Sequence, residues 1–399
     1  MASKMRIFNS IYADYQASTP VNSTVLEKML PYYQEDFANP HSSAHSLGWR
    51  SAAAIDQATS SVAQMIGADQ DEITFTSGAT EANNLAILGL GRHNLNGKRK
   101  KILISSIEHK CSLEAVNALR DKSNYVIEEI PVDNDGFVDL DYLEKSMSDD
   151  VLLVSVGIVN GEIGTIQPLG EVSGMAQRHG VLLHCDAAQG PAAHAVNDIV
   201  EFADLVSLSA HKFYGPKGVG ALYVRRGLNS QIEPLIFGGG QQNGLRSGTL
   251  PTPLVVGMGV ASDIAAQSKT LIQIEELRQT RNRFIGLLKK KIESVSVNGP
   301  SLQSRHPGNA NICFHDRDAR QLLAMMQPRV AASMGSACSS GIIEPSYVLR
   351  AIGLGKDEAN SSIRFSFGYG TTTEDVDDIV DIIAETLAQL PESFLHKIA

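Results

Sequence analysis

Short apolar runs alternate with helical stretches between about residues 73 and 224, and each run ends in a polar or glycine-rich turn. A strand is expected at each of five runs, which are residues 73–75, 102–107, 151–159, 181–183 and 206–209. Strands that alternate with helices form mostly parallel sheets with helices on both faces. The pattern therefore predicts an α/β protein built on a mostly parallel central sheet.

Polar residues follow the carboxyl ends of all five runs. In parallel sheets, ligands bind outside these ends, so we expect the residues to gather at one edge. Taken singly, some have simpler explanations, since an asparagine or aspartate can form a turn and a histidine can cap a helix. Five such ends together predict a binding site. In chain order its candidate residues are Gly78, Ala79, Thr80, His109, Asn160, Asp186, Gln189, Ser209, His211 and Lys212.

The segment "TSGATE" ends one strand and opens a helix, whose first N–H groups can bind an anion. With Ser209 and His211 nearby, it predicts a phosphate cradle. No Gly-x-x-x-x-Gly-Lys-[Ser/Thr] motif occurs, so the cradle is not a P-loop. Lys212 lies between two apolar runs, where burial lowers a lysine pKa by up to about 3–5 units. A phosphate cradle, a buried lysine and Asp186 together indicate pyridoxal phosphate, with the lysine bound to its aldehyde and the aspartate paired with its ring nitrogen.

Composition and charge narrow the class of protein. The chain has 399 residues, enough for about two domains, and its formal net charge of -10 argues against nucleic-acid binding. No apolar run is long enough to cross a membrane, and the N-terminal residues lack the apolar core of a secretory signal. Four scattered cysteines without Cys-x-x-Cys spacing indicate neither a disulfide framework nor a zinc site, and favour a reducing, cytoplasmic location. We expect no metal.

Several sequence blocks carry a resemblance to a known family. The chain resembles the group I cysteine desulfurases, which are dimeric, fold-type I pyridoxal phosphate enzymes with a class V aminotransferase fold. The resemblance runs from Tyr12 to about residue 375. It implies a large cofactor-binding domain at residues 17–260 and a smaller α+β domain made of residues 1–16 and 261–399. The blocks are, in order, "TSGATEANNLAI", "EHK", "VNGEIG", "HCDAAQG", "SAHKFYGPKGVGALYVRR", "LRSGTLP", "SMGSACSSG", "EPSYVLRAIGL" and "SSIRFSFG".

The resemblance also implies a role for each candidate residue. Lys212 would bind the cofactor aldehyde, Asp186 would hold the ring nitrogen, and His109 would stack on the ring and handle protons. Asn160 and Gln189 would contact the region of the phenolic oxygen. The residues implied at the phosphate are Gly78, Ala79, Thr80, Ser209, His211 and, from a second subunit, Thr249.

Two residues would act on the substrate L-cysteine. Arg364 would bind its carboxylate together with Asn160, because a guanidinium matches a carboxylate better than an ammonium does. Cys338 lies among glycines and serines in a loop at about residues 332–345, which we expect to be mobile. Its thiolate would take the sulfur as a persulfide and leave L-alanine. Cys111, Cys185 and Cys313 lie in or beside apolar runs and are expected to be small buried apolar residues.

Partners and competing functions follow from the same residues. The loop "GGGQQNGLRSGTLP" (238–251) would reach the active site of a second subunit, so we expect a homodimer; Arg246 in this loop has a surface charge as the alternative. The sulfur acceptor would be a protein of iron–sulfur assembly, tRNA thiolation or DNA phosphorothioation, and a C-terminal tail shorter than in many housekeeping members leaves this choice open. Two other functions compete: a selenocysteine lyase or another pyridoxal phosphate enzyme of this fold, and a non-catalytic sulfur-pathway adaptor.

Overall fold

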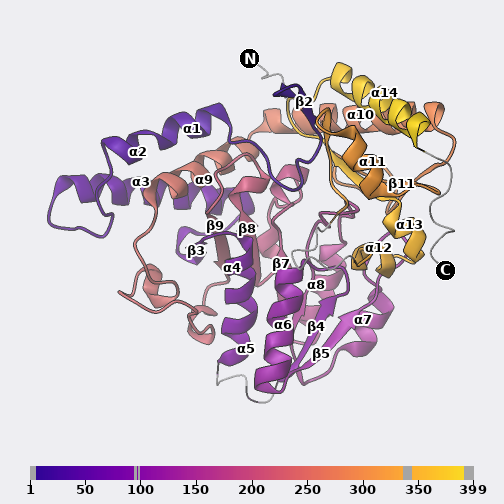
Figure 1. Ribbon diagram of the computed structural model, residues 1–399. Helices are drawn as coiled ribbons and strands as arrows, with labels where there is room; N and C mark the ends of the chain where they lie inside the picture. Colours follow the sequence, from indigo (N-terminus) through magenta and orange to yellow (C-terminus); the bar gives the residue numbers. More distant parts are fainter. Residues whose placement is uncertain (1–5, 94–96, 98, 336–343, 391–399) are drawn as a thin grey trace.

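A seven-stranded sheet forms the centre of the computed structural model, which describes residues 6–93, 97, 99–335 and 344–390 (Figure 1). Six of the strands run in the same direction, and β9 alone runs opposite to its neighbours β3 and β8. The prediction of a mostly parallel sheet is therefore confirmed. In spatial order the strands are β3 (Ile73–Thr76), β9 (Gly220–Val224), β8 (Leu205–Ser209), β7 (Leu182–Asp186), β6 (Val151–Ser155), β4 (Lys101–Ser105) and β5 (Val126–Ile130).

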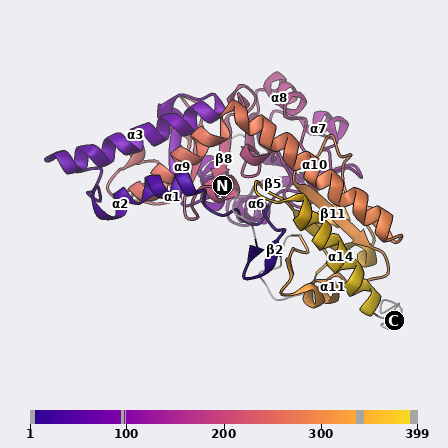
Figure 2. The ribbon, with the colours of Figure 1, turned by 90° about the horizontal axis from the view of Figure 1, so that it is seen from above.

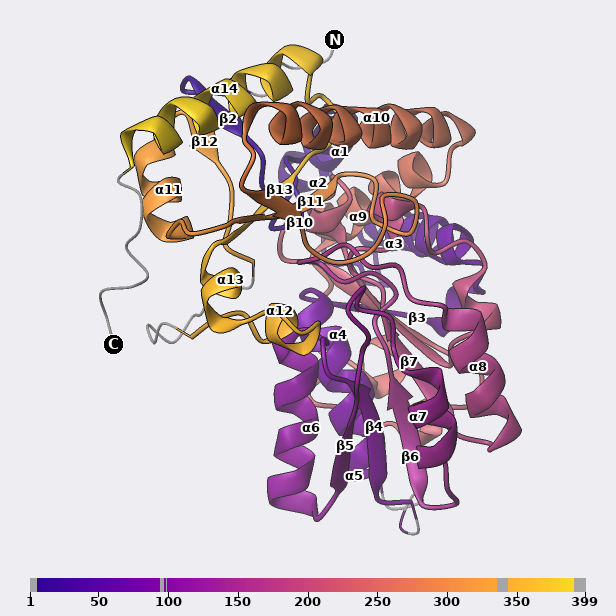
Figure 3. The same ribbon diagram turned by 90° about the vertical axis from the view of Figure 1, so that its right-hand side faces the viewer.

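Helices cover both faces of this sheet because successive strand residues point to opposite sides. On β4, Ile102 and Ile104 pack with the helices of one face, and Leu103 packs with those of the other. Figure 3 shows α4 to α6 on one face and α7 with α8 on the other. The bounds are α4 (Ala79–Asn84), α5 (Leu90–Arg92), α6 (Lys110–Ser123), α7 (Leu140–Ser146) and α8 (Leu169–Arg178), with a π-helical turn at Leu85–Gly89 joining α4 to α5.

Four helices lie beside the β3 end of the sheet, where α9 packs against α1 and α3 (Figure 2). Two of these helices begin with a side chain that accepts a hydrogen bond from a main-chain N–H group: Asn22 caps α1 and His45 caps α3. The bounds are α1 (Ser23–Met29), α2 (Pro31–Gln34), α3 (Ser46–Ile66) and α9 (Thr252–Ala265).

A second hydrophobic core surrounds a three-stranded antiparallel sheet of β10 (Val295–Val297), β11 (Asn309–Phe314) and β13 (Ser362–Ser366). The ring of Phe284 on α10 (Ser268–Lys291) lies 5.0 Å from that of Phe365 and 5.1 Å from that of Phe367. The other elements here are α11 (Ala319–Met326), α12 (Tyr347–Ala351), α13 (Lys356–Asn360), α14 (Thr373–Gln389) and the small sheet of β1 (Arg6–Ile7), β2 (Ser10–Tyr12) and β12 (Val330–Ala331).

The N-terminal segment connects the two cores. Ile11 and Ala13 belong to the second core, and Thr19 then donates through its main-chain N–H to the carbonyl of His211 at the end of β8. Residues 14–19 therefore run across the carboxyl edge of the large sheet. The predicted domain boundaries near residues 16 and 260 stay a prediction. Within the described ranges, no helix is long and apolar enough to cross a membrane.

Candidate active site

The carboxyl edge of the large sheet brings together side chains from the ends of all five predicted strands. Asn160 donates from Nδ2 to the carbonyl of Ile107 at 2.9 Å, which links the ends of β6 and β4. Gln189, after β7, and Lys212, after β8, both donate to the carbonyl of Gln16 at 2.8 Å. These contacts place Asn160, Gln189 and Lys212 at the same edge of the sheet as the end of β4.

Lys212 ends a short 3₁₀ turn, Ala210–Lys212, directly after β8. Its Nζ donates to the main-chain oxygens of Gln16 at 2.8 Å and Ala17 at 2.9 Å. Burial lowers the pKa of Lys212 to about 8; the charge of Arg364 adds to this shift, and Asp186 and Asp14 oppose it. A lysine with this pKa has a substantial fraction of free amine near neutral pH, so it can act as a nucleophile or base.

Asp186 is the last residue of β7, and both of its carboxylate oxygens have a donor. Oδ1 accepts from the main-chain N–H of Ala188 at 2.9 Å, and Oδ2 accepts from Nδ2 of Asn83 at 2.6 Å. Asn83 is fully buried on α4. Sequence reasoning missed Asn83, although it stands in the "TEANN" block that carried the resemblance.

His109 is the N-cap of α6, so the simpler explanation that it caps a helix is correct as far as its Nδ1 is concerned. Nδ1 accepts from the main-chain N–H of Cys111 at 3.2 Å, and the sulfur of Cys111 lies 2.9 Å from the same nitrogen. The ring is exposed at the carboxyl edge. The cap uses Nδ1 and leaves Nε2 available to contact a ligand, so His109 can both cap α6 and have the predicted catalytic role.

Asn160 stabilises its own turn. Its Oδ1 accepts the main-chain N–H groups of Glu162 at 2.9 Å and Ile163 at 3.0 Å, in addition to the contact that Nδ2 makes with Ile107. An asparagine that bonds to the backbone two residues on is a common turn former. The structure therefore gives Asn160 the turn role that was weighed as its alternative, and contact with a cofactor or substrate stays a prediction.

Arg364 on β13 brings a cation from the second core to the edge of the large sheet. Its NH2 group pairs with Oδ1 of Asp14 at 2.6 Å, and its NH1 group donates to the carbonyl of Gly161 at 2.9 Å. Its Nε is buried and has no hydrogen-bond partner among the described residues. Burial raises the pKa of Asp14, and the charge of Arg364 opposes that shift. A guanidinium has five N–H donors, so Arg364 can also bind a carboxylate.

The turn between β3 and α4 contains the predicted phosphate cradle. Helical structure continues from Ala79 to Arg92, and its first N–H groups have no acceptor within the helix. A Cβ on Gly220 of β9 would lie 2.7 Å from the Cα of Gly78, so only glycine lets the turn approach β9 this closely. Ser209 is buried beside Gly78: a Cβ built on Gly78 would lie 3.8 Å from the Oγ of Ser209.

His211 and Thr80 are two further residues predicted at the phosphate. Nδ1 of His211 is 3.3 Å from the hydroxyl of Ser18, and burial lowers the pKa of His211 to about 4, with Lys212 and Lys217 adding to the shift. The imidazole is therefore a neutral hydrogen-bonding group at physiological pH. Thr80 is exposed on the first turn of α4.

The loop at 238–251, which contains Thr249, is fixed to the outer edge of the sheet. The side-chain amide of Gln242 takes the place of a neighbouring strand: it accepts from the main-chain N–H of Phe75 at 2.6 Å and donates to its carbonyl at 3.0 Å. Arg246 pairs with Glu81 on α4 at 2.8 Å, so it forms a largely buried ion pair within this chain. Thr249 is exposed, and its contact with a second subunit stays a prediction.

The cysteines fall into three groups. Cys185 and Cys313 are buried, as predicted for small apolar residues. Cys111 is half-buried and contacts His109 and Asn83 through its sulfur, so the same prediction is wrong for it. Cys338 and the core of its predicted loop lie outside the described residues. Among those that are described, no group of three His, Cys, Asp or Glu side chains could hold a metal ion.

A buried carboxyl group also lies at this edge, and sequence reasoning missed it. Glu108 accepts a hydrogen bond from the main-chain N–H of Gly157. Burial raises the pKa of Glu108 to about 8, and the nearby charge of Asp186 adds to the shift. Glu108 is therefore largely protonated at neutral pH. Its hydrogen bond to Gly157 links the residue before the N-cap of α6 to the segment after β6.

The ionisation of Glu108 gives a testable dependence of stability on pH. Between pH 6.5 and 8 the folded protein keeps a proton on Glu108 that the unfolded chain has already lost, so stability is expected to fall as pH rises, by about 1.4 kcal/mol per unit. Glu108→Gln cannot ionise and keeps an oxygen for Gly157, so its free energy of unfolding should lack this slope. Urea unfolding across this range measures it.

The matched control is Glu114→Gln, which changes an exposed glutamate on α6. The window begins at pH 6.5 because buried histidines such as His184, with a pKa lowered to about 4, contribute an opposite slope below that value. Equal slopes for Glu108→Gln and the unaltered protein would show that Glu108 is not protonated in the folded state.

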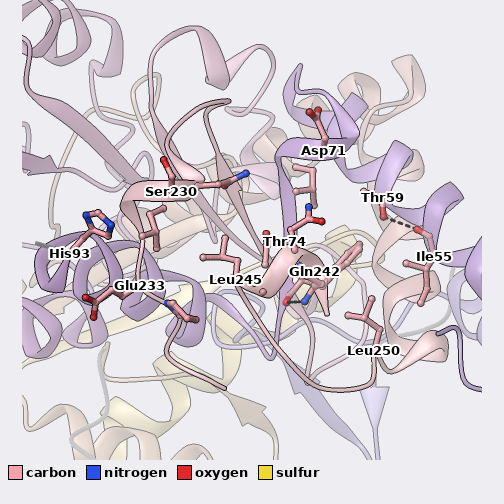
Figure 4. Close-up of a pocket in the computed structure, with 17 residues that line it drawn as sticks. Ile55, Thr59, Asp71, Thr74, His93, Ser230, Glu233, Gln242, Leu245 and Leu250 are labelled. Atoms are coloured by element: carbon pink, nitrogen blue, oxygen red, sulfur yellow. Dashed lines mark hydrogen bonds between the residues drawn. The ribbon is translucent and has the colours of Figure 1, made fainter. Parts of the chain in front are cut away.

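A pocket of about 520 Å³ lies elsewhere, between β3, α3 and the segments at 229–234 and 242–250. Figure 4 shows its lining, which includes Asp71, His93, Glu233 and Gln242. None of the residues predicted for the site lines this pocket. The chemistry suggested by the sequence is therefore placed at the carboxyl edge, and not in this pocket.

The residues at the carboxyl edge fit pyridoxal phosphate. An amine with a pKa of about 8 suits an aldehyde, a carboxylate held by two donors suits a protonated ring nitrogen, and a helix start beside a buried serine suits a phosphate. Gln16 Nε2 and Arg364 Nε are buried here without a partner among the described residues, which adds donors for an anionic ligand. The fold and the site together define a fold-type I enzyme of the aminotransferase type.

Comparisons with known proteins agree with this class. The chain matches the family described as aminotransferase class-V over residues 11–379. A cysteine desulfurase IscS of Rickettsia massiliae (strain Mtu5) is 45% identical over 383 residues, which are 96% of this chain and 92% of the relative. The IscS of Rickettsia rickettsii (strain Iowa) is 44% identical over 380 residues, which are 95% of this chain and 92% of the relative.

Solved structures show the same relationship. A NifS-like protein superposes with a TM-score of 0.88 at 33% identity, covering 95% of this chain and 99% of the other. A structure described as SspA in complex with cysteine has a TM-score of 0.78 at 37% identity, covering 90% and 99%. The chain belongs to the cysteine desulfurases of the aminotransferase class-V family, as the sequence blocks predicted.

Proposed function

We propose that this protein takes the sulfur atom from L-cysteine, leaves L-alanine, and carries the sulfur as a persulfide on Cys338 until a protein acceptor collects it. One observation carries the proposal: the amine of Lys212 lies at the carboxyl edge near Asp186, in a chain 45% identical to a cysteine desulfurase. The likeness to a structure holding cysteine supports the choice of substrate.

Pyridoxal phosphate is the proposed cofactor. Lys212 would hold its aldehyde, Asp186 its ring nitrogen, and His109 and Gln189 would lie against the ring and its phenolic oxygen. When bound, the cofactor withdraws electrons from the substrate's Cα, which side chains alone cannot do. The proposed phosphate ligands are Gly78, Ala79, Thr80, Ser209 and His211, with Thr249 from a second subunit. A homodimer is therefore part of the proposal.

The remaining steps are performed by this chain's own residues. The free amine of Lys212, with its pKa of about 8, moves the Cα proton of the substrate. The thiolate of Cys338 then attacks the substrate sulfur, so that an S–S bond forms on Cys338, the substrate's C–S bond breaks, and the Cβ of the departing alanine takes a proton. Delivery to iron–sulfur assembly, tRNA thiolation or DNA phosphorothioation would begin from this persulfide.

Arg364 is the proposed partner of the substrate carboxylate. Arg364→Lys keeps the charge but loses the planar set of donors, and the loss of a hydrogen bond between charged groups costs about 1.5–3 kcal/mol. The KM for L-cysteine should therefore rise by roughly 10- to 100-fold. Steady-state alanine formation measures this change, with Arg329→Lys, which alters an exposed ion pair with Glu385, as the control. An unchanged KM would contradict the assignment.

Reconstitution of the purified full-length protein tests the function. With added pyridoxal phosphate it should turn yellow, and borohydride should fix the cofactor to Lys212. With L-cysteine and a thiol reductant it should form alanine and sulfide in equal amounts. A protein that stays colourless would contradict the cofactor, and a coloured protein that forms no alanine from cysteine would contradict the reaction.

A further inference from the structure

Four side chains at the carboxyl edge form a continuous series of hydrogen bonds from Asp186 to His109. Nδ2 of Asn83 donates to Oδ2 of Asp186 at 2.6 Å and lies 3.2 Å from the sulfur of Cys111. That sulfur is 2.9 Å from Nδ1 of His109. Of the other three side chains in this series, only that of Cys111 contacts the imidazole of His109. Asp186 and His109 are therefore linked through Asn83 and Cys111.

The direction of each bond follows from the groups involved. A carboxylate only accepts, so Asn83 must present its NH₂ group to Asp186, and the second hydrogen of that group points to the sulfur of Cys111. The thiol then has its own hydrogen to donate, and Nδ1 of His109 is the acceptor beside it.

Nδ1 of His109 receives a second donor, the main-chain N–H of Cys111 at 3.2 Å. A ring nitrogen that accepts hydrogen bonds carries no proton, so the proton of a neutral imidazole is then on Nε2. The Nε2–H group faces away from the helix that Nδ1 caps, toward the exposed side of the ring. The series therefore favours one tautomer of His109.

Cys111 is in the protonation state that this role needs. Burial raises its pKa to about 11, the charge of Asp186 adds to the shift, and the hydroxyls of Thr80 and Ser112 with the amide of Asn83 oppose it. The S–H group is therefore present throughout the neutral range. The same property argues against Cys111 as a sulfur carrier, because the thiolate is the nucleophilic form.

We propose that Cys111 is a positioning residue, which fixes His109 as the Nε2–H tautomer and so presents an N–H donor to the groups that react. The inference rests on the proposed function, in which His109 handles protons beside the ring. It adds a residue to that function: a thiol that takes no part in sulfur transfer and acts through the imidazole next to it.

The tautomer can be measured directly by NMR on the full-length protein labelled with ¹⁵N-histidine, as purified and again after pyridoxal phosphate is added. The resonances of His109 are assigned by their loss in His109→Gln. In the unaltered protein, Nε2 should carry the proton and Nδ1 should not. Cys111→Ala keeps the main-chain N–H as a donor to Nδ1 but loses the S–H donor, so the Nδ1–H form should become more populated than in the unaltered protein. Cys111→Ser should restore the original state, since a hydroxyl donates and accepts in the same way.

Activity supplies an independent readout. Cys111→Ala should lower kcat for alanine formation by roughly three- to tenfold, the effect of one lost hydrogen bond, without changing the KM for L-cysteine. Cys111→Ser should recover most of that loss. If the serine variant is as impaired as the alanine variant, a hydrogen-bond donor at position 111 is not what supports the rate, and the inference is wrong.

The two readouts separate this inference from the proposed function. An unchanged tautomer in Cys111→Ala would overturn the positioning role even if the protein desulfurates cysteine normally. A protein that forms no alanine at all would contradict the proposed function, and the NMR result would still decide which tautomer Cys111 supports.

Discussion

Lys212→Arg is expected to give a folded protein that forms no covalent bond to pyridoxal phosphate and no alanine from L-cysteine. The amine of Lys212 is held by the carbonyls of Gln16 and Ala17, and burial with the charge of Arg364 lowers its pKa to about 8. A guanidinium stays charged in proteins, so arginine neither attacks an aldehyde nor moves a proton. Loss of the proton transfer alone should slow the reaction by roughly 10²–10⁴-fold.

Two measurements test this expectation: absorbance of the bound cofactor before and after borohydride reduction, and alanine formed per minute. The matched control is Lys217→Arg, which changes an exposed lysine in the glycine- and proline-rich turn that follows. The control should keep both colour and activity. Covalent fixation of the cofactor by borohydride in Lys212→Arg would move the attachment point to another residue and contradict the site.

Cys338→Ala is expected to abolish release of sulfur from L-cysteine while cofactor binding is kept. The cysteine stands in "SMGSACSSG", whose small residues suit a thiol that must both reach and leave the site. Without its thiolate, no S–S bond can form and the substrate C–S bond is not broken by attack on sulfur. Removal of an essential nucleophile commonly costs on the order of 10³-fold or more in kcat.

The expected loss is measured as sulfide and alanine production, with the cofactor absorbance as a check on the fold. Cys313→Ala serves as the control because it alters a buried cysteine on β11. If Cys338→Ala keeps its activity toward cysteine, the nucleophile is assigned wrongly. Activity that survives only toward selenocysteine would favour the competing selenocysteine lyase.

The sequence predicted the sheet and its functional edge well because both depend on local patterns. A short apolar run followed by a polar turn marks a buried strand and its end wherever it occurs in the chain. Lys212 after β8 and Asp186 at the end of β7 were found in this way. The ends of the strands were predicted less accurately, since the strand expected at 151–159 ends at Ser155. The strand β5 was not predicted.

The residues that sequence reasoning missed are those whose importance lies in their neighbours. Cys111 was taken for a small apolar residue, but it contacts His109 and Asn83. For Asn160 both a ligand contact and a turn were considered; its oxygen is used by its own turn, and the ligand contact stays a prediction. The linear sequence does not distinguish a half-buried thiol from a cysteine in the core. Nor does it distinguish an asparagine that forms a turn from one that binds a ligand.

The sequence by itself determined the class of fold, the family, and which chain segments carry polar groups, since strand periodicity and turn composition are local properties. Only the tertiary structure decided which of these groups touch. Arg364 meets Asp14 across 350 positions, and burial of Glu108, with the charge of Asp186 nearby, raises its pKa to about 8. Such contacts depend on how the two cores pack together, and they set the protonation states of the site because burial and nearby charge both act through distance.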